Sequence, residues 1–152
     1  MSRPVTCALV AAALLHAGAA HAVLGEAAAS VQADQMRVRG ARALHVALTH
    51  QVHEIVMADG SRIREFVSAD GVVFAVAWNT RLKPDLQALL GLHHSAYMAA
   101  AREALRQPGV HRHVVLRQGD LVVHSSGHLN SFVGKAYVPS LVPRGTDLDA
   151  IR

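Results

Sequence analysis

Residues 44–78 read LHVALTHQVHEIVMADGSRIREFVSADGVVFAVAW, and this stretch carries the strongest structural signal in the chain. Its runs of β-branched and aromatic residues are interrupted twice by Ala-Asp-Gly, at 58–60 and at 69–71. Asp-Gly between hydrophobic runs is a strong hairpin signal, because glycine adopts the left-handed conformation that such turns need. The stretch therefore predicts a three-stranded antiparallel meander.

Charge indicates the register of this meander. Two-residue Asp-Gly loops would place Glu54 directly opposite Glu65, and like charges at opposed positions destabilise a sheet. Three-residue Ala-Asp-Gly loops instead place Glu54 opposite Arg64 and His53 opposite Glu65, so we predict three-residue loops. With this register one face carries His53, Ile55, Met57, Ile63, Glu65, Val67, Val73, Ala75 and Ala77, and the other carries Val52, Glu54, Val56, Arg62, Arg64, Phe66, Phe74, Val76 and Trp78.

A helix is predicted after the meander, from Pro84 to about Arg106. Pro84 loses nothing at a helix start, and Asp85 is favourable near the positive end of the helix dipole. Apolar residues then recur at steps of three and four, and Gly91 marks a point where the helix can bend. The apolar stripe is expected to pack on the sheet; it consists of Leu86, Leu89, Leu90, His93, Tyr97, Ala100, Ala101, Ala104 and Leu105.

The rest of the chain returns to strands. Strands are predicted at 113–117, 120–124 and 129–138, separated by a Gln-Gly turn at 118–119 and a Ser-Ser-Gly turn at 125–127. Together with the meander these strands predict an α+β fold, in which one antiparallel sheet of five to six strands has one long helix packed on one face.

The predicted α+β domain spans residues 44–139, followed by an irregular C-terminal tail at 140–152 that carries Pro143 and Gly145. Because one helix covers only one face, the other apolar face needs the N-terminal segment, the tail or a partner to cover it.

The first 22 residues have the pattern of a secretory signal peptide. Arg3 gives a positive start, an apolar run follows from Val5, and Ala20-His21-Ala22 fits the small-residue cleavage pattern. The run is too short for a spanning helix, which needs about 20 apolar residues. We therefore expect cleavage after Ala22, a periplasmic or secreted mature protein and no membrane span. Residues 23–43 form an N-terminal segment in which 26–39 could be a short helix.

Composition limits the classes of function. The chain has 152 residues, one cysteine, and 15 Lys and Arg against 11 Asp and Glu, a formal net charge of +4. This size indicates one domain, and the modest charge without a Lys/Arg block argues against a nucleic-acid partner. Because Cys7 lies in the predicted leader, the mature chain is expected to have neither disulfides nor thiol redox chemistry.

Several short motifs carry a family resemblance. They include Arg64-Glu65-Phe66-Val67, Val73 to Trp78 (VFAVAW), Pro84-Asp85-Leu86, and Gly134 to Pro139 (GKAYVP). With these motifs the chain resembles a bacterial family of small exported proteins known as domain of unknown function 2844. The resemblance implies export and a shared fold, and it implies no activity and no catalytic residue.

Known catalytic and nucleotide motifs are missing from the sequence. His53-Glu54 begins like a zinc-protease motif, but Met57 stands where the second histidine is required. There is no Gly-x-Ser-x-Gly elbow and no glycine-rich phosphate loop before a helix. An enzyme is therefore a minor interpretation, kept as an unrecognised small hydrolase with no catalytic residue assigned.

The histidines suggest a metal site. Of the eleven histidines, His16 and His21 lie in the predicted leader and nine remain. A two-residue loop at 118–119 would place His113 opposite His124, and a loop at 125–127 would place His124 opposite His128, while His111 shares their face. Such a row of imidazoles could bind zinc or copper. The alternative is a set of surface histidines on a sheet rim. The candidate metal ligands are His111, His113, His124 and His128.

A second candidate surface lies on the meander. The predicted register gathers arginines and large aromatic side chains on one face, a composition typical of protein-binding hot spots, with Glu54 orienting Arg64. The alternative is a second core layer with the arginines at its rim. This candidate interaction surface consists of Arg62, Arg64, Phe66, Phe74 and Trp78.

The sequence as a whole favours an exported, non-enzymatic module that acts through protein contact. The expected partner is an unknown envelope protein or a second copy of the chain. The alternatives, in order, are a histidine-row metal protein that binds zinc or copper and an unrecognised small hydrolase.

Overall fold

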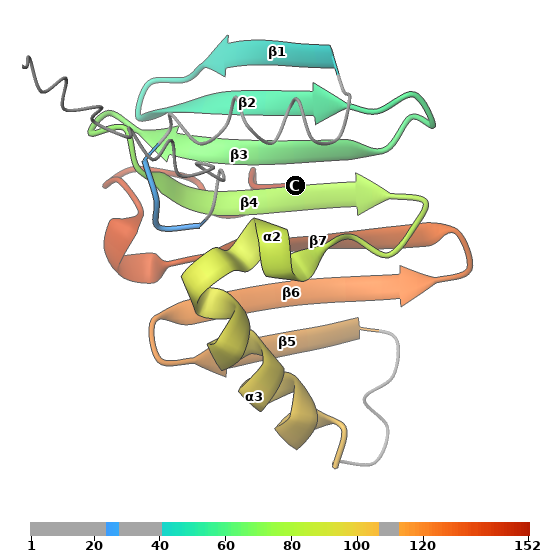
Figure 1. Cartoon of the computed structure of the whole chain (residues 1–152). Helices are drawn as coiled ribbons and strands as arrows, with labels where there is room; N and C mark the ends of the chain where they lie inside the picture. The colour runs from blue at the N-terminus through green and yellow to red at the C-terminus, as the bar shows by residue number, and fades with distance from the viewer. Residues whose placement is uncertain (1–23, 28–40, 107–112) are drawn as a thin grey trace, which may run out of the picture.

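The computed structural model describes residues 24–27, 41–106 and 113–152. An α+β fold is confirmed, with an antiparallel sheet of seven strands rather than the predicted five to six, in the order β1-β2-β3-β4-β7-β6-β5 (Figure 1). The elements are β1 (Ala41–Val46), β2 (His50–Val56), β3 (Arg62–Ser68), β4 (Val73–Thr80), α2 (Leu86–Leu90), η2 (Gly91–His93), α3 (His94–Ala104), β5 (His113–Gln118), β6 (Leu121–His128), β7 (Ser131–Tyr137) and η3 (Pro139–Leu141).

The register predicted for the first hairpin of the meander is confirmed. Glu54 pairs with Arg64 and His53 pairs with Glu65. Gly60 and Gly71 have φ of +82° and +77°, the left-handed conformation that three-residue loops require at this position. The like-charge pair of the alternative register is thus avoided.

One further strand precedes the predicted meander. Residues 44–57 do not form a single strand, because the chain reverses at Leu48-Thr49, where Ala47 N donates to the His50 carbonyl at 2.9 Å. β1 therefore pairs with β2 as a separate edge strand that begins at Ala41, inside the segment predicted to be non-strand.

A β-bulge at Phe74 corrects the predicted faces of β4. Phe66 pairs with Ala75 and Val67 with Val73, so Phe74 is an extra residue on β4. A bulge inserts one residue and reverses the side-chain alternation beyond it. Ala75 and Ala77 consequently share a face with Arg64, whereas Val76 and Trp78 lie on the opposite face.

The predicted helix is present as a continuous helical run of α2, η2 and α3. Asp85 is the N-cap, and its side chain accepts a hydrogen bond from Ala88 N at 3.0 Å. The α-helix begins at Leu86 rather than at Pro84. The predicted bend occurs at Gly91, where φ is +47° and the chain changes to a 3-10 turn.

Both predicted turns of the C-terminal strands are displaced. Gln118 pairs with Leu121, so the first loop is Gly119-Asp120. The segment 125–127 continues β6, and the second loop is Leu129-Asn130, with Asn130 at φ +58°. Asparagine tolerates this left-handed conformation, which explains why the turn forms there.

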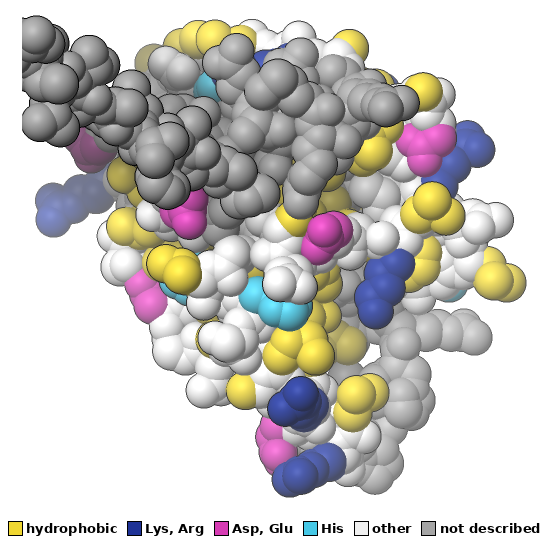
Figure 2. All heavy atoms as spheres, in the orientation of Figure 1, with side chains coloured by type: hydrophobic (Ala, Val, Ile, Leu, Met, Phe, Trp, Pro, Cys, Tyr) yellow, Lys and Arg dark blue, Asp and Glu magenta, His cyan; other side chains and the backbone are white. Residues whose placement is uncertain are grey.

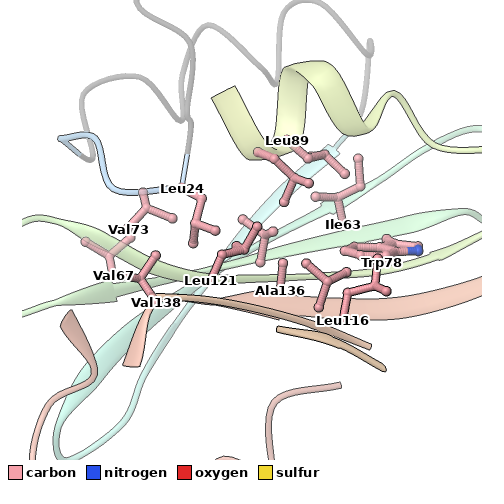
Figure 3. Close-up of a cluster of buried hydrophobic side chains, with 13 residues drawn as sticks. Leu24, Ile63, Val67, Val73, Trp78, Leu89, Leu116, Leu121, Ala136 and Val138 are labelled. Carbon is pink, nitrogen blue, oxygen red and sulfur yellow. The ribbon is translucent and has the colours of Figure 1, made fainter. Parts of the chain in front are cut away.

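The sheet is covered on both faces. The helix face is the one beneath α2 and α3 (Figure 1), and it buries Leu24, Trp78, Leu89 and Leu90 with the inward residues of the strands (Figure 3). The tail face is covered by the C-terminal tail, through Val142, Leu148 and Ile151, and Ile151 is the most buried of these side chains, at 1% exposure. Of the three covers that the sequence left open for this face, the tail is therefore the one that packs there.

Several predictions fall outside the described residues: the signal peptide at 1–22, nearly all of the possible helix at 26–39, and His111. The described part of the N-terminal segment packs against the sheet. Leu24 is buried, and Gly25 N donates to the Val73 carbonyl at 2.8 Å. Within 24–27, 41–106 and 113–152, none of the helices has the length and apolarity needed to cross a membrane.

Candidate functional site

The five residues of the predicted interaction surface do not form one surface. Trp78 is 2% exposed on the helix face, because the bulge at Phe74 turns it away from the arginines. Phe66 and Phe74 are buried beneath the tail and contact each other with ring centroids 6.3 Å apart. This set is therefore corrected to two accessible residues, Arg62 and Arg64.

Arg62 and Arg64 line a groove on the tail face. The groove, here called the arginine groove, has a volume of about 360 Å³. β3 supplies the two arginines, β4 and β7 supply a largely apolar floor, and the tail supplies a third arginine. The lining residues are Arg62, Arg64, Ala77, Trp78, Asn79, Val133 and Arg152.

Arg64 is fixed in the groove by two contacts. Its Nε donates to Glu54 Oε1 at 2.8 Å, and its Nη1 donates to the main-chain oxygen of Arg152. Glu54 is 14% exposed and also lies 3.8 Å from Arg62 Nη1, which is a longer and weaker contact. The Arg62 side chain is 54% exposed, so most of its donors face the groove or solvent.

The charge of the groove is positive. Arg62 and Arg64 carry guanidinium groups at the groove, and Glu54 is the carboxylate in contact with both of them. Guanidinium groups stay protonated at all ordinary pH values and bind carboxylates or phosphates through paired N–H donors. The apolar floor of Ala77 and Val133 suits a ligand with hydrocarbon next to its negative charge.

The tail that borders the groove is held by side chains of the sheet. Lys135 Nζ donates to the Leu148 carbonyl at 2.6 Å, and Thr49 Oγ1 lies 3.1 Å from Thr146 Oγ1. Ser140 donates to Asp120 where the tail begins. These contacts satisfy backbone and side-chain groups of an irregular segment, which has no hydrogen-bond ladder of its own.

The histidine pairs predicted for a metal site are not formed. His113 pairs with Ser126, and His124 pairs with Val115 on β5 and Lys135 on β7. His124 and His128 lie four residues apart on the same strand, which separates their Cα atoms by about 13 Å. Among residues 24–27, 41–106 and 113–152, no three His, Cys, Asp or Glu side chains are grouped so that they could hold a metal ion.

His124 lies in a positive and partly buried environment. Its ring stacks on Tyr137 with centroids 6.3 Å apart. Burial lowers the pKa of His124 below its ordinary value, and the charges of Lys135, Arg117 and His113 lower it further. This environment favours the neutral imidazole and repels a cation.

The serine side chains of the described residues show no hydrolase arrangement. Ser61 Oγ donates to Asp59 Oδ2 at 2.9 Å, and this bond together with the Ser61 backbone N–H lowers the pKa of Asp59. In the part of the chain that the structure describes, no serine hydroxyl is hydrogen-bonded to a histidine. The Ser61–Asp59 contact is a loop contact that closes the turn between β2 and β3.

Half of the groove was not predicted from the sequence. Ala77, Asn79 and Val133 reach the tail face only because of the bulge and of the pairing of β4 with β7. Arg152 is 88 residues from the Arg64 side chain that contacts its main-chain oxygen, and no local pattern links them. The signal that was available is the pair Arg62 and Arg64, which lie two residues apart and so share one face of β3.

Charged side chains are dispersed over the helix face. Figure 2 views this face and shows Lys and Arg separated by acidic, apolar and polar side chains. Nucleic-acid backbones are bound by continuous basic patches or stripes. The described residues on this face form no such stripe, so the arginine groove on the opposite face remains the main candidate site.

Comparison with known proteins gives a family and no named relative. No curated protein and no solved structure matches the sequence. The family model described as "Protein of unknown function (DUF2844)" matches residues 20–151, which confirms the resemblance found in the sequence motifs. Since this match covers most of the chain, the protein belongs to the DUF2844 family.

Proposed function

We propose that this protein is an exported module that acts by contact, holding an acidic segment of another envelope protein in the arginine groove. The observation that carries the proposal is the groove itself, in which Arg62 and Arg64 lie beside a largely apolar floor. None of its lining side chains is a nucleophile or a proton donor and acceptor near neutral pH, so the groove is suited to binding rather than to chemistry.

The fixed position of Arg64 supports this role. Glu54 and the main-chain oxygen of Arg152 hold its guanidinium in place before a ligand arrives. A donor that is already ordered loses less side-chain entropy on binding, which favours affinity. Arg62 is more exposed and supplies donors for a carboxylate that approaches from solvent.

Binding to an acidic probe tests the groove. The probe is a hexaglutamate peptide with blocked ends, measured by calorimetry at low salt against the untagged protein. We expect Arg62→Glu to weaken binding about ten-fold or more, which corresponds to about 1.4 kcal/mol. Arg117→Glu is the matched control, because it makes the same change of charge on the tail face of the sheet, on β5 and outside the groove.

Equal loss of binding in Arg62→Glu and Arg117→Glu would mean that net charge, and not the groove, attracts the probe. A third outcome is that the peptide does not bind, while inorganic phosphate binds and Arg62→Glu weakens its binding. This outcome would identify a small anion as the ligand. A photocrosslinking residue at Asn79, which lines the groove, then identifies the natural partner in cells.

Export is the second part of the proposal. The positive start, the apolar run and the Ala-His-Ala site at 20–22 support a cleaved leader. The family match begins at residue 20, so residues 1–19 of the predicted leader lie outside the matched part. Intact-mass measurement on protein from the periplasm or the medium is expected to give a chain that begins at Val23. A chain that begins at Met1 and stays in the cytoplasm would contradict export.

A further inference from the structure

The outer edge of β1 is the most exposed part of the sheet. All six residues of β1 are exposed, and hydrophobic side chains project from it and from the loop that follows. Leu44 is 52% exposed, Val46 75% and Leu48 fully exposed. β1 is the first strand in the sheet order, at the top of the sheet in Figure 1, and hydrophobic side chains line the same upper rim in Figure 2.

Native proteins usually protect such an edge. Proline, lysine, a bulge or an inward-pointing charge interrupts most edge strands, because the free backbone groups otherwise pair with another chain. The sequence of β1 is ARALHV, with neither proline nor lysine, and its pairing with β2 is regular from end to end. Its arginine, Arg42, donates to His53 Nδ1 on β2 and so does not shield the edge.

The register of β1 on β2 shows which backbone groups point outward. Ala47 N donates to the His50 carbonyl, so Ala47 and His50 form a hydrogen-bonded pair. Hydrogen-bonded and non-hydrogen-bonded pairs alternate along an antiparallel ladder. Ala41, Ala43 and His45 therefore bond to β2, while Arg42, Leu44 and Val46 turn their N–H and C=O groups away from the sheet.

We propose that β1 pairs antiparallel with β1 of a second copy of this chain, about a two-fold axis through Leu44. Leu44 then lies opposite the Leu44 of the other copy, and Arg42 lies opposite Val46 in both directions. This register engages every outward-pointing backbone group of β1, because Arg42, Leu44 and Val46 become the hydrogen-bonded pairs. A register centred on Ala43 would leave the outward groups of Val46 beyond the end of the partner strand.

The side chains of β1 are compatible with self-pairing. On the helix face the two leucines meet, and each Val46 packs against the aliphatic part of Arg42. On the tail face Ala43 lies opposite His45, and His45 stays near Glu54, 3.9 Å from its carboxylate. No like charges are brought directly opposite each other, which is the arrangement that destabilises strand pairs. The strand is thus complementary to itself.

This inference goes beyond the arginine groove, since the groove lies on β3, β4, β7 and the tail. Two six-residue strands bury a small area, so the dimer is expected to be weak, with half-association on the order of 10 μM. A C2 dimer is the commonest closed assembly and is consistent with an isologous strand pair.

Sedimentation velocity over a range of concentrations tests the dimer, using the protein expressed from residues 1–152 and purified untagged. We expect a concentration-dependent monomer–dimer equilibrium. Leu44→Lys places two lysines opposite each other and should weaken association about ten-fold or more. Val115→Lys is the matched control on the other edge strand, where Val115 is 45% exposed, and should leave association unchanged.

Hydrogen exchange followed by NMR gives a second and independent measurement. The amides of Ala43 and His45 should be protected at every concentration, because they bond to β2. The amides of Arg42, Leu44 and Val46 should exchange quickly in dilute solution and become protected as the dimer forms.

A monomer at all concentrations, a dimer that Leu44→Lys leaves intact, or a dimer lost only in Val115→Lys would each overturn the proposal. None of these outcomes changes the expected effect of Arg62→Glu on peptide binding, so the two proposals fail separately.

Discussion

The two faces of the sheet are covered by different kinds of structure. The helix face is covered by α2 and α3, whose backbone groups are bonded within the helices, and its core is formed largely by aliphatic side chains. The tail face is covered by residues 139–152, which form one short 3-10 turn and otherwise no helix or strand. The irregular cover takes its hydrogen bonds from polar side chains of the sheet and its neighbouring loops, such as Lys135 and Arg64.

This difference explains why strand side chains on the tail face donate hydrogen bonds to main-chain oxygens of the tail. An irregular segment cannot satisfy its own carbonyls, so the strands beneath it must supply donors. One of these donors, Arg64, also lines the arginine groove. The backbone groups of α2 and α3 are bonded within the helices, so they need no such donors from the strands.

Gly134→Ala is expected to have the largest effect, because it disturbs the packing of the helix face. A Cβ at Gly134 would lie 2.3 Å from Trp78 Cζ2 and 2.5 Å from the His124 carbonyl oxygen. A backbone oxygen cannot move aside cheaply, so we expect a loss of about 3 kcal/mol or more in the free energy of unfolding. Urea denaturation followed by Trp78 fluorescence measures it.

Gly60→Ala is the control for that substitution. Gly60 has φ +82°, and a Cβ added there would have no neighbouring atom within 4 Å, so only backbone strain is added. We expect a loss of about 1 kcal/mol. Equal losses at Gly134 and Gly60 would mean that Trp78 does not pack against β7.

Ile151→Ala should cause the next largest loss of stability, and it should disturb the packing of the tail face alone. The side chain is 1% exposed and packs with Phe66, Phe74 and Tyr137. Removal of a buried isoleucine side chain costs about 2–4 kcal/mol. Limited proteolysis should also release the tail faster, while the helices stay protected. An unchanged urea midpoint would show that the tail is not docked in solution.

Acidification should destabilise the protein, mainly through the tail face. Burial lowers the pKa of His50, which contacts Phe66 and Phe74, and burial with nearby cations lowers that of His124. A histidine with a lowered folded-state pKa contributes stability above about pH 6.5, and this stability is lost as the pH falls. We expect a lower melting temperature at pH 5.5 than at pH 7.5.

The double variant His50→Leu and His124→Leu should reduce this pH dependence, because both titrating groups are removed. His53, on the helix face, also has a lowered pKa from burial and from Arg42, so a part of the dependence should remain. If the melting temperature of the double variant falls as much between pH 7.5 and pH 5.5 as that of the unchanged protein, the pH dependence arises on the helix face.

The first half of the sheet could be predicted because its signals are local. The two Ala-Asp-Gly loops, and the repulsion avoided between Glu54 and Glu65, were sufficient to predict the register of β2 on β3. The helix was predictable from its periodic stripe and from Pro84 and Asp85. β1 was missed, since Leu48-Thr49 carries no Gly, Pro, Asn or Asp to mark a turn.

The second half and the site depend on long-range contacts. No sequence pattern marks the bulge at Phe74, and one bulge was enough to move Trp78 to the other face. The Ser-Ser-Gly sequence at 125–127 predicts a turn, but the turn forms at Asn130, which displaces the predicted histidine pairs. Of the arginine groove, Arg62 and Arg64 were predicted, whereas Arg152 joins them only through the packing of the tail.

Addition of zinc should have the smallest effect on the melting temperature. His113 and His124 share the tail face but are not opposite each other, and Arg117 and Lys135 surround His124 with positive charge. Because a divalent cation would be repelled there, we expect one equivalent of zinc, or a chelator, to leave the melting temperature unchanged. Native mass spectrometry of chelator-free protein provides the second measurement. A stoichiometric zinc mass that disappears in His124→Gln would contradict this expectation, and it would mean that His124 turns toward a ligand set that includes residues outside those described.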